Sequence, residues 1–190
     1  MRKHQIAGLL ALFIATLSSA HADVVSLVGD EDGFGIGLTN GSGVVYSDIN
    51  ALDVQGTDAW FYGDQSVTHS YSLPASILSA SLEVFTAGQG LGGLSNIYLN
   101  GTLIGQLTDG DGVGPSYNYA WKDTFNLTPY IGLLTGSDVV SIRTPASGDG
   151  WALDYSKLTI TAAVPEASTY GMLLAGLGVV GALARRRRLS

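Results

Sequence analysis

The chain has 190 residues, of which 46% are hydrophobic and 13% charged, and it contains no cysteine. It carries 9 basic and 16 acidic residues, a net charge of −7. The basic residues gather at the two ends, so residues 23–163 keep three of them against fifteen acidic residues, a net charge of −12. Such a segment repels nucleic acid and anionic lipid and favours cations as ionic partners. Without cysteine, a disulfide framework is excluded.

The N-terminus has the order of parts of a secretory signal peptide. Two basic residues follow Met, an apolar run extends from Ile6 to Leu17, and Ala20 and Ala22 are the small residues of a cleavage site. We therefore predict that residues 1–22 are read by the export machinery and removed by signal peptidase. The mature chain should begin at Asp23.

The segment between the two ends predicts an all-β fold. Short runs rich in Val, Ile, Tyr, Thr and Phe are separated by Gly, Asp, Asn and Ser clusters, which is typical of a sandwich or barrel. Residues 23–163 are numerous enough to bury one core and are predicted to be a single domain. Polar and apolar residues alternate in two runs of this segment, and we expect their apolar members to face the core: Ala80, Leu82, Val84, Leu158, Ile160 and Ala162.

Carboxylates occur near both ends of this segment. Asp30 and Asp32 lie close to its start, and Asp149 and Asp154 close to its end. Calcium takes six to eight oxygen ligands, so Asp30, Asp32 and Asp154 are the candidate ligands of a structural calcium ion. Solvated acidic turns are the commoner explanation of such residues. An EF-hand loop is excluded, because neither Asp30 nor Asp109 begins the required pattern.

Three adjacent aromatic residues, Trp60 to Tyr62, point to alternate faces of a predicted strand, so at least one should be exposed or cover a loop. Trp151 follows a glycine-rich turn. Trp60 and Trp151 are therefore candidates for stacking on a ligand.

A second aromatic set, Tyr117, Tyr119 and Trp121, alternates along another predicted strand. These residues alternate in step with Phe125 and Leu127, which predicts that they face the core. Asp123 stands in the same series, and a polar residue there indicates that a bulge could turn the aromatic residues outward.

The best local signal is Asn100-Gly101 between two apolar runs. Asn-Gly at this position predicts a two-residue type I′ hairpin, because both central residues need a positive φ.

The sequence gives catalysis little support, and no catalytic residue is assigned. His69 is the only histidine of residues 23–163, and no G-x-S-x-G motif occurs. A satisfied strand histidine explains His69 better than a triad does. A pair of carboxylates for glycoside hydrolysis remains the enzymatic alternative, because fifteen acidic residues always allow a pair.

The C-terminus has three parts in order: Val164-Pro165-Glu166, an apolar run from Gly171 to Ala184, and four arginines from Arg185. This order resembles the PEP-CTERM sorting tail of bacterial surface proteins, although Ala167 stands where the family usually has a second proline. The apolar run is short for the roughly 30 Å hydrocarbon core, so it makes only a thin transmembrane helix. The arginines should stay cytoplasmic.

The resemblance implies that residues 164–190 are recognised and processed by an exosortase-type enzyme after transient anchoring in the inner membrane. An ordinary C-terminal anchor is the alternative. The protein would then reach the cell envelope or the extracellular matrix of a bacterium, where related proteins are associated with exopolysaccharide and biofilm.

The middle of the chain carries a second resemblance. Asn96 to Gly105 and Phe125 to Ile142 are similar to segments of galactose-binding-like jelly rolls. We therefore expect a single jelly-roll-like β-sandwich over residues 23–163, flanked by the signal peptide and a short apolar helix. An exported, non-catalytic surface or matrix protein is the leading interpretation. A carbohydrate-binding module, stabilised by calcium, is the alternative, and a glycoside hydrolase comes third.

Overall fold

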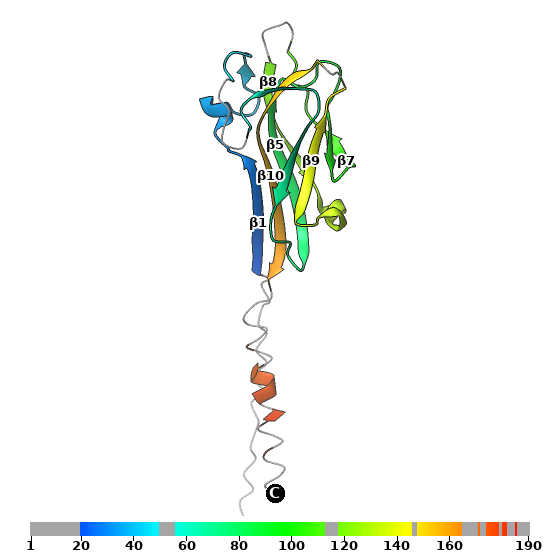
Figure 1. The fold of residues 1–190 in the computed structure, drawn as a ribbon. Helices are drawn as coiled ribbons and strands as arrows, with labels where there is room; N and C mark the ends of the chain where they lie inside the picture. The colour runs from blue at the N-terminus through cyan, green and yellow to red at the C-terminus, as the bar shows by residue number, and fades with distance from the viewer. Residues whose placement is uncertain are drawn as a thin grey trace, which may run out of the picture. The chain divides into compact units, whose positions relative to one another are not determined.

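The computed structural model describes residues 20–49, 56–112, 118–145 and 148–164, together with residues 171, 174–178, 180–181 and 185. The chain divides into two units, His21–Ala163 and a unit made of the two ends. The first unit is a β-sandwich of two antiparallel sheets, so the predicted fold class is confirmed (Figure 1).

The larger sheet has the strand order β1-β10-β5-β8-β2, and β3 pairs with β10. Figure 1 shows β1, β10 and β5 side by side in this layer. The strands of the larger sheet are β1 (Ala20–Gly29), β2 (Gly43–Val44), β3 (Trp60–Tyr62), β5 (Ile77–Ala87), β8 (Asn118–Asn126) and β10 (Gly150–Val164).

The smaller sheet has the order β4-β9-β6-β7. Asn100 and Gly101 join β6 to β7 with φ angles of 49° and 82°, so the predicted type I′ hairpin is confirmed. The remaining elements are β4 (Gln65–Ser70), β6 (Asn96–Leu99), β7 (Thr102–Gln106), β9 (Ser137–Arg143) and the short helical turns η1 (Gly33–Gly37) and η2 (Thr128–Leu133).

The main core lies between the two sheets. The alternating residues predicted to face inward are all buried, and Leu82 and Leu158 have no exposed surface. They meet the inward residues of β6 and β9, such as Ile97 and Val140. Period-two alternation was therefore a sufficient guide to these six core positions.

A second, smaller core covers the other face of the larger sheet. Phe34, Val44 and Ile49, from the segment that follows β1, pack around Phe85 and Tyr155. The Phe34 and Phe85 ring centroids are 5.3 Å apart. This packing fixes the segment that carries the first candidate aspartates.

A β-bulge interrupts β10 rather than β8. The pairing of β10 with β5 shifts register between Leu153 and Tyr155, which leaves Asp154 without an opposite residue. β8 pairs with β5 without a shift from Ala120 to Asn126, so the bulge that Asp123 signalled is absent from this ladder. Asp123 instead accepts hydrogen bonds from the backbone and side chain of Thr108.

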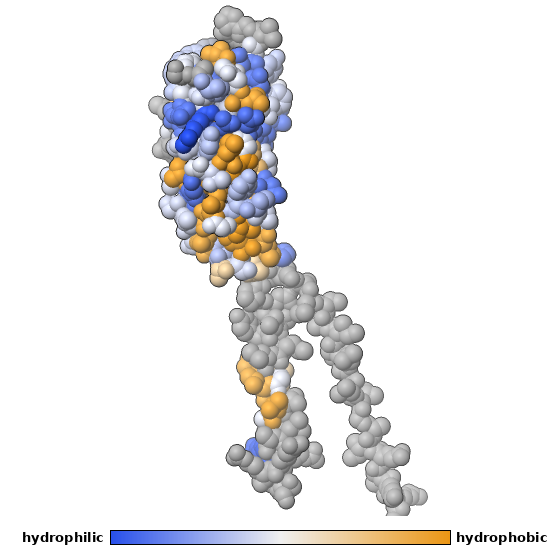
Figure 2. Space-filling model, turned by 90° about the vertical axis from the view of Figure 1, so that its right-hand side faces the viewer, coloured by the Kyte–Doolittle hydropathy of each residue, from blue (hydrophilic) through white to orange (hydrophobic). Residues whose placement is uncertain are grey.

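The surface of the sandwich is chemically mixed. Figure 2 shows hydrophilic side chains over one part of the face seen there and apolar side chains gathered over another. The exposed apolar residues of the domain include Leu73, Leu78, Leu103 and Val139. Apolar atoms make up much of any folded surface, so these exposures need no special explanation.

The described residues of the C-terminal apolar run, which include Leu174 and Leu177, are helical. Among the described residues of the chain, no helix has both the length and the apolar character needed to cross a membrane. The structure therefore does not show the transmembrane helix that the sequence predicted.

Candidate functional site

Four aspartates from three parts of the chain meet beside the β10 bulge. Asp30 and Asp32 follow β1, Asp58 precedes β3, and Asp154 is the bulge residue. One carboxylate oxygen from each residue lies within 4.8 Å of the others. The three predicted ligands are therefore brought together, and Asp58 joins them. Asp149 does not, since its carboxylate accepts from the Gly90 N–H at 3.0 Å.

The backbone around this acidic cluster is shaped to bring the carboxylates together. Gly29 has a φ of +84°, and a Cβ there would lie 2.1 Å from the Asp154 carbonyl oxygen, so only glycine allows β1 to pass β10 this closely. The backbone of Asp58 and of Phe34 lies in the left-handed region, at φ 56° and 62° respectively. Non-glycine residues in this region are strained, and such strain gathers at functional sites.

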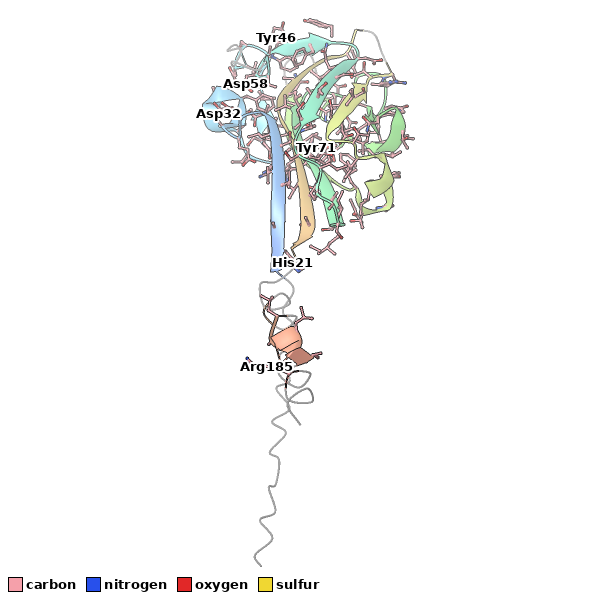
Figure 3. The ribbon with its side chains drawn as sticks, turned by 60° about the horizontal axis from the view of Figure 1, so that its bottom comes forward. His21, Asp32, Tyr46, Asp58, Tyr71 and Arg185 are labelled. Atoms are coloured by element: carbon pink, nitrogen blue, oxygen red, sulfur yellow. The ribbon has the colours of Figure 1, made fainter. Side chains whose placement is uncertain are left out.

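Hydrogen bonds orient two of the carboxylates. The Phe34 N–H donates to Asp154 Oδ1 at 2.7 Å, and the Gly35 N–H donates to Asp32 Oδ1 at 2.6 Å. The Asp58 N–H donates to the Leu153 carbonyl oxygen at 2.9 Å, which ties Asp58 to the strand that carries Asp154. Figure 3 labels Asp32 and Asp58 at the same end of the sandwich.

Two members of the acidic cluster are almost completely buried. Asp58 is 3% exposed and Asp154 is 0% exposed. Burial raises the pKa of both carboxyl groups, and the neighbouring aspartates raise the pKa of Asp58 further. Among the described residues, no hydrogen-bond donor reaches Asp58 Oδ1 or Asp154 Oδ2. Buried carboxylates normally have a donor or a cation. A proton shared between Asp58 and Asp154, or a bound cation, would satisfy these two atoms.

A second cluster consists of three aromatic residues, Tyr46, Trp60 and Tyr62, which we call the aromatic cluster. The rings of Tyr46 and Trp60 stack with centroids 4.8 Å apart, and the Trp60 Nε1–H donates to the Tyr46 carbonyl oxygen at 2.9 Å. The hydroxyl groups of the two tyrosines lie 3.3 Å apart. Tyr46 is 52% exposed and Tyr62 is 61% exposed, so about half or more of each tyrosine is open to solvent.

Glycines let the rings lie directly on the backbone. A Cβ at Gly88 would be 2.8 Å from the Trp60 ring, and one at Gly150 would be 3.2 Å from the Tyr62 ring. The predicted alternation of residues 60–62 is confirmed: Trp60 packs on the smaller core, Phe61 packs on the main core, and Tyr62 is exposed.

The other aromatic candidates are placed differently. Trp151 is 0% exposed, and its Nε1–H donates to the Gly63 carbonyl oxygen at 2.9 Å, so it presents no ring for stacking. Trp151 and Leu153 both face the main core. The glycines next to Trp151 indicated a turn in the sequence, and this inward position was therefore not predicted. Trp121 is half-buried, Tyr119 is exposed, and Tyr117 lies outside the described residues.

A cleft of about 280 Å³ opens beside Asp154 and is lined also by Glu31, Lys122 and Tyr155. Two of its charged residues, Glu31 and Lys122, are paired with residues outside the lining. Lys157 contacts Glu31 at 2.6 Å, and the Tyr155 hydroxyl donates to Glu83 at 2.6 Å. Lys122 Nζ lies 3.6 Å from Glu83 Oε1. Glu31 and Glu83 therefore each have a partner within the domain.

His69 is a fully buried strand histidine. Its Nε2 lies 2.9 Å from Ser156 Oγ, and its Nδ1 lies 3.1 Å from the Ser26 carbonyl oxygen. Burial lowers the pKa of its imidazole. Both ring nitrogens are thus satisfied inside the domain, as the strand-histidine interpretation expects.

The residues of the predicted processing sites fall at the edges of the described region. Ala20 and Ala22 lie in the first three residues of β1, and Val164 is the last residue of β10. Pro165 and Glu166 lie outside the described residues.

Sequence reasoning missed Asp58 and Tyr46. Asp58 follows a Gly-Thr pair directly before an aromatic strand, which marks a turn but not a ligand. Nothing in the sequence around Tyr46 connects it with Trp60, because their stacking depends on the fold.

The solved structures similar to this chain are distant. One is the CBM36-1 domain of a multidomain xylanase from the hindgut metagenome of Trinervitermes trinervoides, with 15% identity, a TM-score of 0.35, and coverage of 76% of this chain and 100% of that one. Another is a carbohydrate-binding module CBM36 in complex with calcium and xylotriose, with 9% identity, a TM-score of 0.33, and coverage of 62% and 98%.

A third is BuGH86 in complex with neoagarooctaose, with 11% identity, a TM-score of 0.41 and coverage of 75% of this chain. The chain spans 19% of the length of that protein. All three likenesses are too distant to indicate what this chain binds.

No curated protein matches the chain. Residues 163–188, in contrast, match the family model described as the PEP-CTERM protein-sorting motif. The match covers the predicted motif, the apolar run and the arginines, so the resemblance drawn from these residues is confirmed. The chain therefore carries a PEP-CTERM protein-sorting motif at its C-terminus.

Proposed function

We propose that this protein is an exported, non-catalytic component of the bacterial surface or extracellular matrix that binds polysaccharide. The sorting motif at residues 163–188 and the predicted signal peptide at residues 1–22 support export and handling by an exosortase-type enzyme. The arginines would hold the tail on the cytoplasmic side of the inner membrane until processing. The released domain would then act in the cell envelope or matrix, including exopolysaccharide and biofilm.

The aromatic cluster is the observation that carries polysaccharide binding. Sugar rings have apolar faces of C–H groups that pack on aromatic rings, while their hydroxyl groups hydrogen-bond to tyrosine. Tyr46 and Tyr62 offer both features at once, and the contacts of Trp60 hold the rings in place before a ligand arrives. Such preorganisation reduces the entropy lost on binding.

The test is binding of the purified domain, residues 21–163, which form a compact unit, to a panel of soluble bacterial and plant polysaccharides. We expect Tyr62→Ala to weaken binding about tenfold, since an aromatic contact contributes about 0.5–1.5 kcal/mol beyond its buried area and about 1.4 kcal/mol corresponds to a tenfold change in Kd. Tyr119→Ala is the matched control, because Tyr119 is also an exposed tyrosine but lies outside the aromatic cluster. Equal binding by the two variants would contradict the assignment.

We also propose that the acidic cluster binds one calcium ion. Hard carboxylate oxygens from four residues match the preference of calcium, and the buried Asp58 Oδ1 and Asp154 Oδ2 need a positive partner. A cation would join the segment after β1, the segment before β3, and β10. Its role would be structural, so it would add stability to the folded domain.

Thermal unfolding at fixed ionic strength tests this site. A ligand that binds only the folded state at 100 times its Kd adds about 2.7 kcal/mol, so low calcium concentrations should raise the Tm more than magnesium does. Asp32→Asn should abolish the increase. Asp48→Asn, which removes the same charge from an exposed aspartate outside the acidic cluster, should keep it. Equal responses of all three proteins would leave only general screening.

A further inference from the structure

The acidic cluster and the aromatic cluster share one short ladder of backbone pairs. Asp58 is two residues before Trp60, and Asp154 is two residues after Ala152. Ala152 pairs with Trp60, and the Asp58 N–H donates to Leu153 at 2.9 Å. The carboxylates and the aromatic rings are therefore held by the same few residues of β3 and β10.

The side chains of Trp60 and Phe61 anchor β3 on the two cores, whereas its backbone is held by one short ladder. The strand is three residues long, and within the described residues it pairs with β10 alone. Two of its side chains are nonetheless members of the aromatic cluster. Only Ala59 lies between Asp58 and the strand, so a change in the position of Asp58 would act on Trp60 and Tyr62 through a short stretch of backbone.

The acidic cluster has reason to move when no cation is bound. One carboxylate oxygen from each of the four residues lies within 4.8 Å of the others. Two of these residues, Asp58 and Asp154, are buried, so like charges there repel more strongly than they would in water. Asp58 also has a left-handed backbone at φ 56°. A cation would offset the repulsion and hold this strained conformation, whereas its removal would favour local opening of residues 56–62.

We propose that a divalent cation in the acidic cluster fixes β3 and thereby sets the aromatic cluster for binding, so that polysaccharide binding depends on the cation. This inference rests on the proposed function, because it describes how the same surface is controlled. The cation acts through Asp58 and the β3–β10 ladder and need not touch the sugar. In Figure 3, Asp32, Asp58 and Tyr46 are labelled at the same end of the sandwich.

The first experiment needs no polysaccharide. Amide hydrogen exchange of the domain is measured in calcium and in a chelator at the same ionic strength. We expect the amides of Trp60 to Tyr62 to exchange about tenfold more slowly in calcium, because local opening is suppressed. The hairpin at residues 97–104, in the other sheet, is the internal control and should not change. The double variant Asp30→Asn/Asp32→Asn should lose the protection, and Asp48→Asn should keep it.

The second experiment measures polysaccharide affinity under the same two conditions. The unmodified domain should bind about tenfold or more weakly in the chelator, and Tyr62→Ala should lose binding while keeping the calcium-dependent protection. If no polysaccharide binds, the proposed function is contradicted. The effect of calcium on β3 is still tested, because hydrogen exchange measures it without a polysaccharide. Protection confined to residues 29–35, or unchanged exchange at Trp60 to Tyr62, would overturn the inference.

Discussion

Trp60 stacks on Tyr46 at a centroid distance of 4.8 Å and donates its indole N–H to the carbonyl oxygen of the same residue at 2.9 Å. They are fourteen positions apart in the sequence. The double contact gives Tyr46, which is otherwise an exposed residue on a loop, a fixed position beside β3. A binding surface built from loop residues needs such a support if it is to be ordered before the ligand arrives.

Trp60→Phe tests that support. Phenylalanine keeps an aromatic ring but cannot donate to Tyr46, so the domain should lose about 0.5–1.5 kcal/mol of stability. Urea unfolding measures this loss. Tyr46→Phe removes only an exposed hydroxyl contact and should change stability by less than about 0.5 kcal/mol. If Trp60→Phe is as stable as the parent, the indole hydrogen bond does not hold the loop.

The assignment of the main core is tested by Leu82→Ala. Leu82 is fully buried between the sheets, so its truncation should lower the free energy of unfolding by about 2–5 kcal/mol. Leu103→Ala is the matched control, because Leu103 is 50% exposed on β7 and should change stability by less than about 0.5 kcal/mol. Similar effects of the two substitutions would mean that the inward parity of β5 is misassigned.

The regular parts of the fold could be predicted because they depend on local rules. Alternation fixed the inward faces of β5 and β10, and Asn100-Gly101 fixed one hairpin. The sequence also predicted Asp30, Asp32 and Asp154 as ligands of one ion, and the structure places these residues together.

The rest could not be predicted because it depends on irregular backbone. The bulge at Asp154 changes the phase of β10, so Trp151 faces the core although a turn precedes it. Asp58 and Tyr46 take their places through contacts between segments far apart in the sequence, and no local pattern reports such contacts. Single-residue bulges and positive φ values at non-glycine residues leave little trace in composition.

Processing of the two ends gives a prediction of mass. The mature protein should begin at Asp23 and end in the region of residues 164–166 in a host that has an exosortase. The domain should tolerate both cuts, since the Asp23 carboxylate accepts from Thr161 Oγ1 at 2.8 Å and β10 ends at Val164. Intact mass spectrometry of surface-extracted protein measures the outcome. A species that keeps the four arginines in such a host would contradict processing and indicate a plain anchor.

His69 gives a prediction of pH dependence. Burial lowers the pKa of its imidazole in the folded state from the ordinary value of 6.5. The unfolded chain then binds the proton more readily, so the stability that this group contributes is present above that value and is lost as pH falls through the folded pKa. His69→Gln should destabilise the domain by about 1–3 kcal/mol at neutral pH through its lost hydrogen bonds.

The difference between parent and His69→Gln should narrow as pH falls from about 7.5 to about 5, because only the parent carries this group. Unfolding free energies at both values measure it. Comparing the two proteins cancels the carboxyl groups of the acidic cluster, which are the same in both. Parallel pH profiles would show that His69 is not held neutral by its surroundings.

Asp58→Asn should reverse its effect on stability between calcium and chelator. In calcium the substitution removes a buried ligand and weakens cation binding, so the variant should melt below the parent. In chelator it removes a buried carboxylate that lies close to three others, so the variant should melt at or above the parent. Asp48→Asn makes the same change of charge at an exposed residue and should show no reversal. A variant that melts below the parent by the same interval under both conditions would mean that Asp58 serves the fold alone and holds no cation.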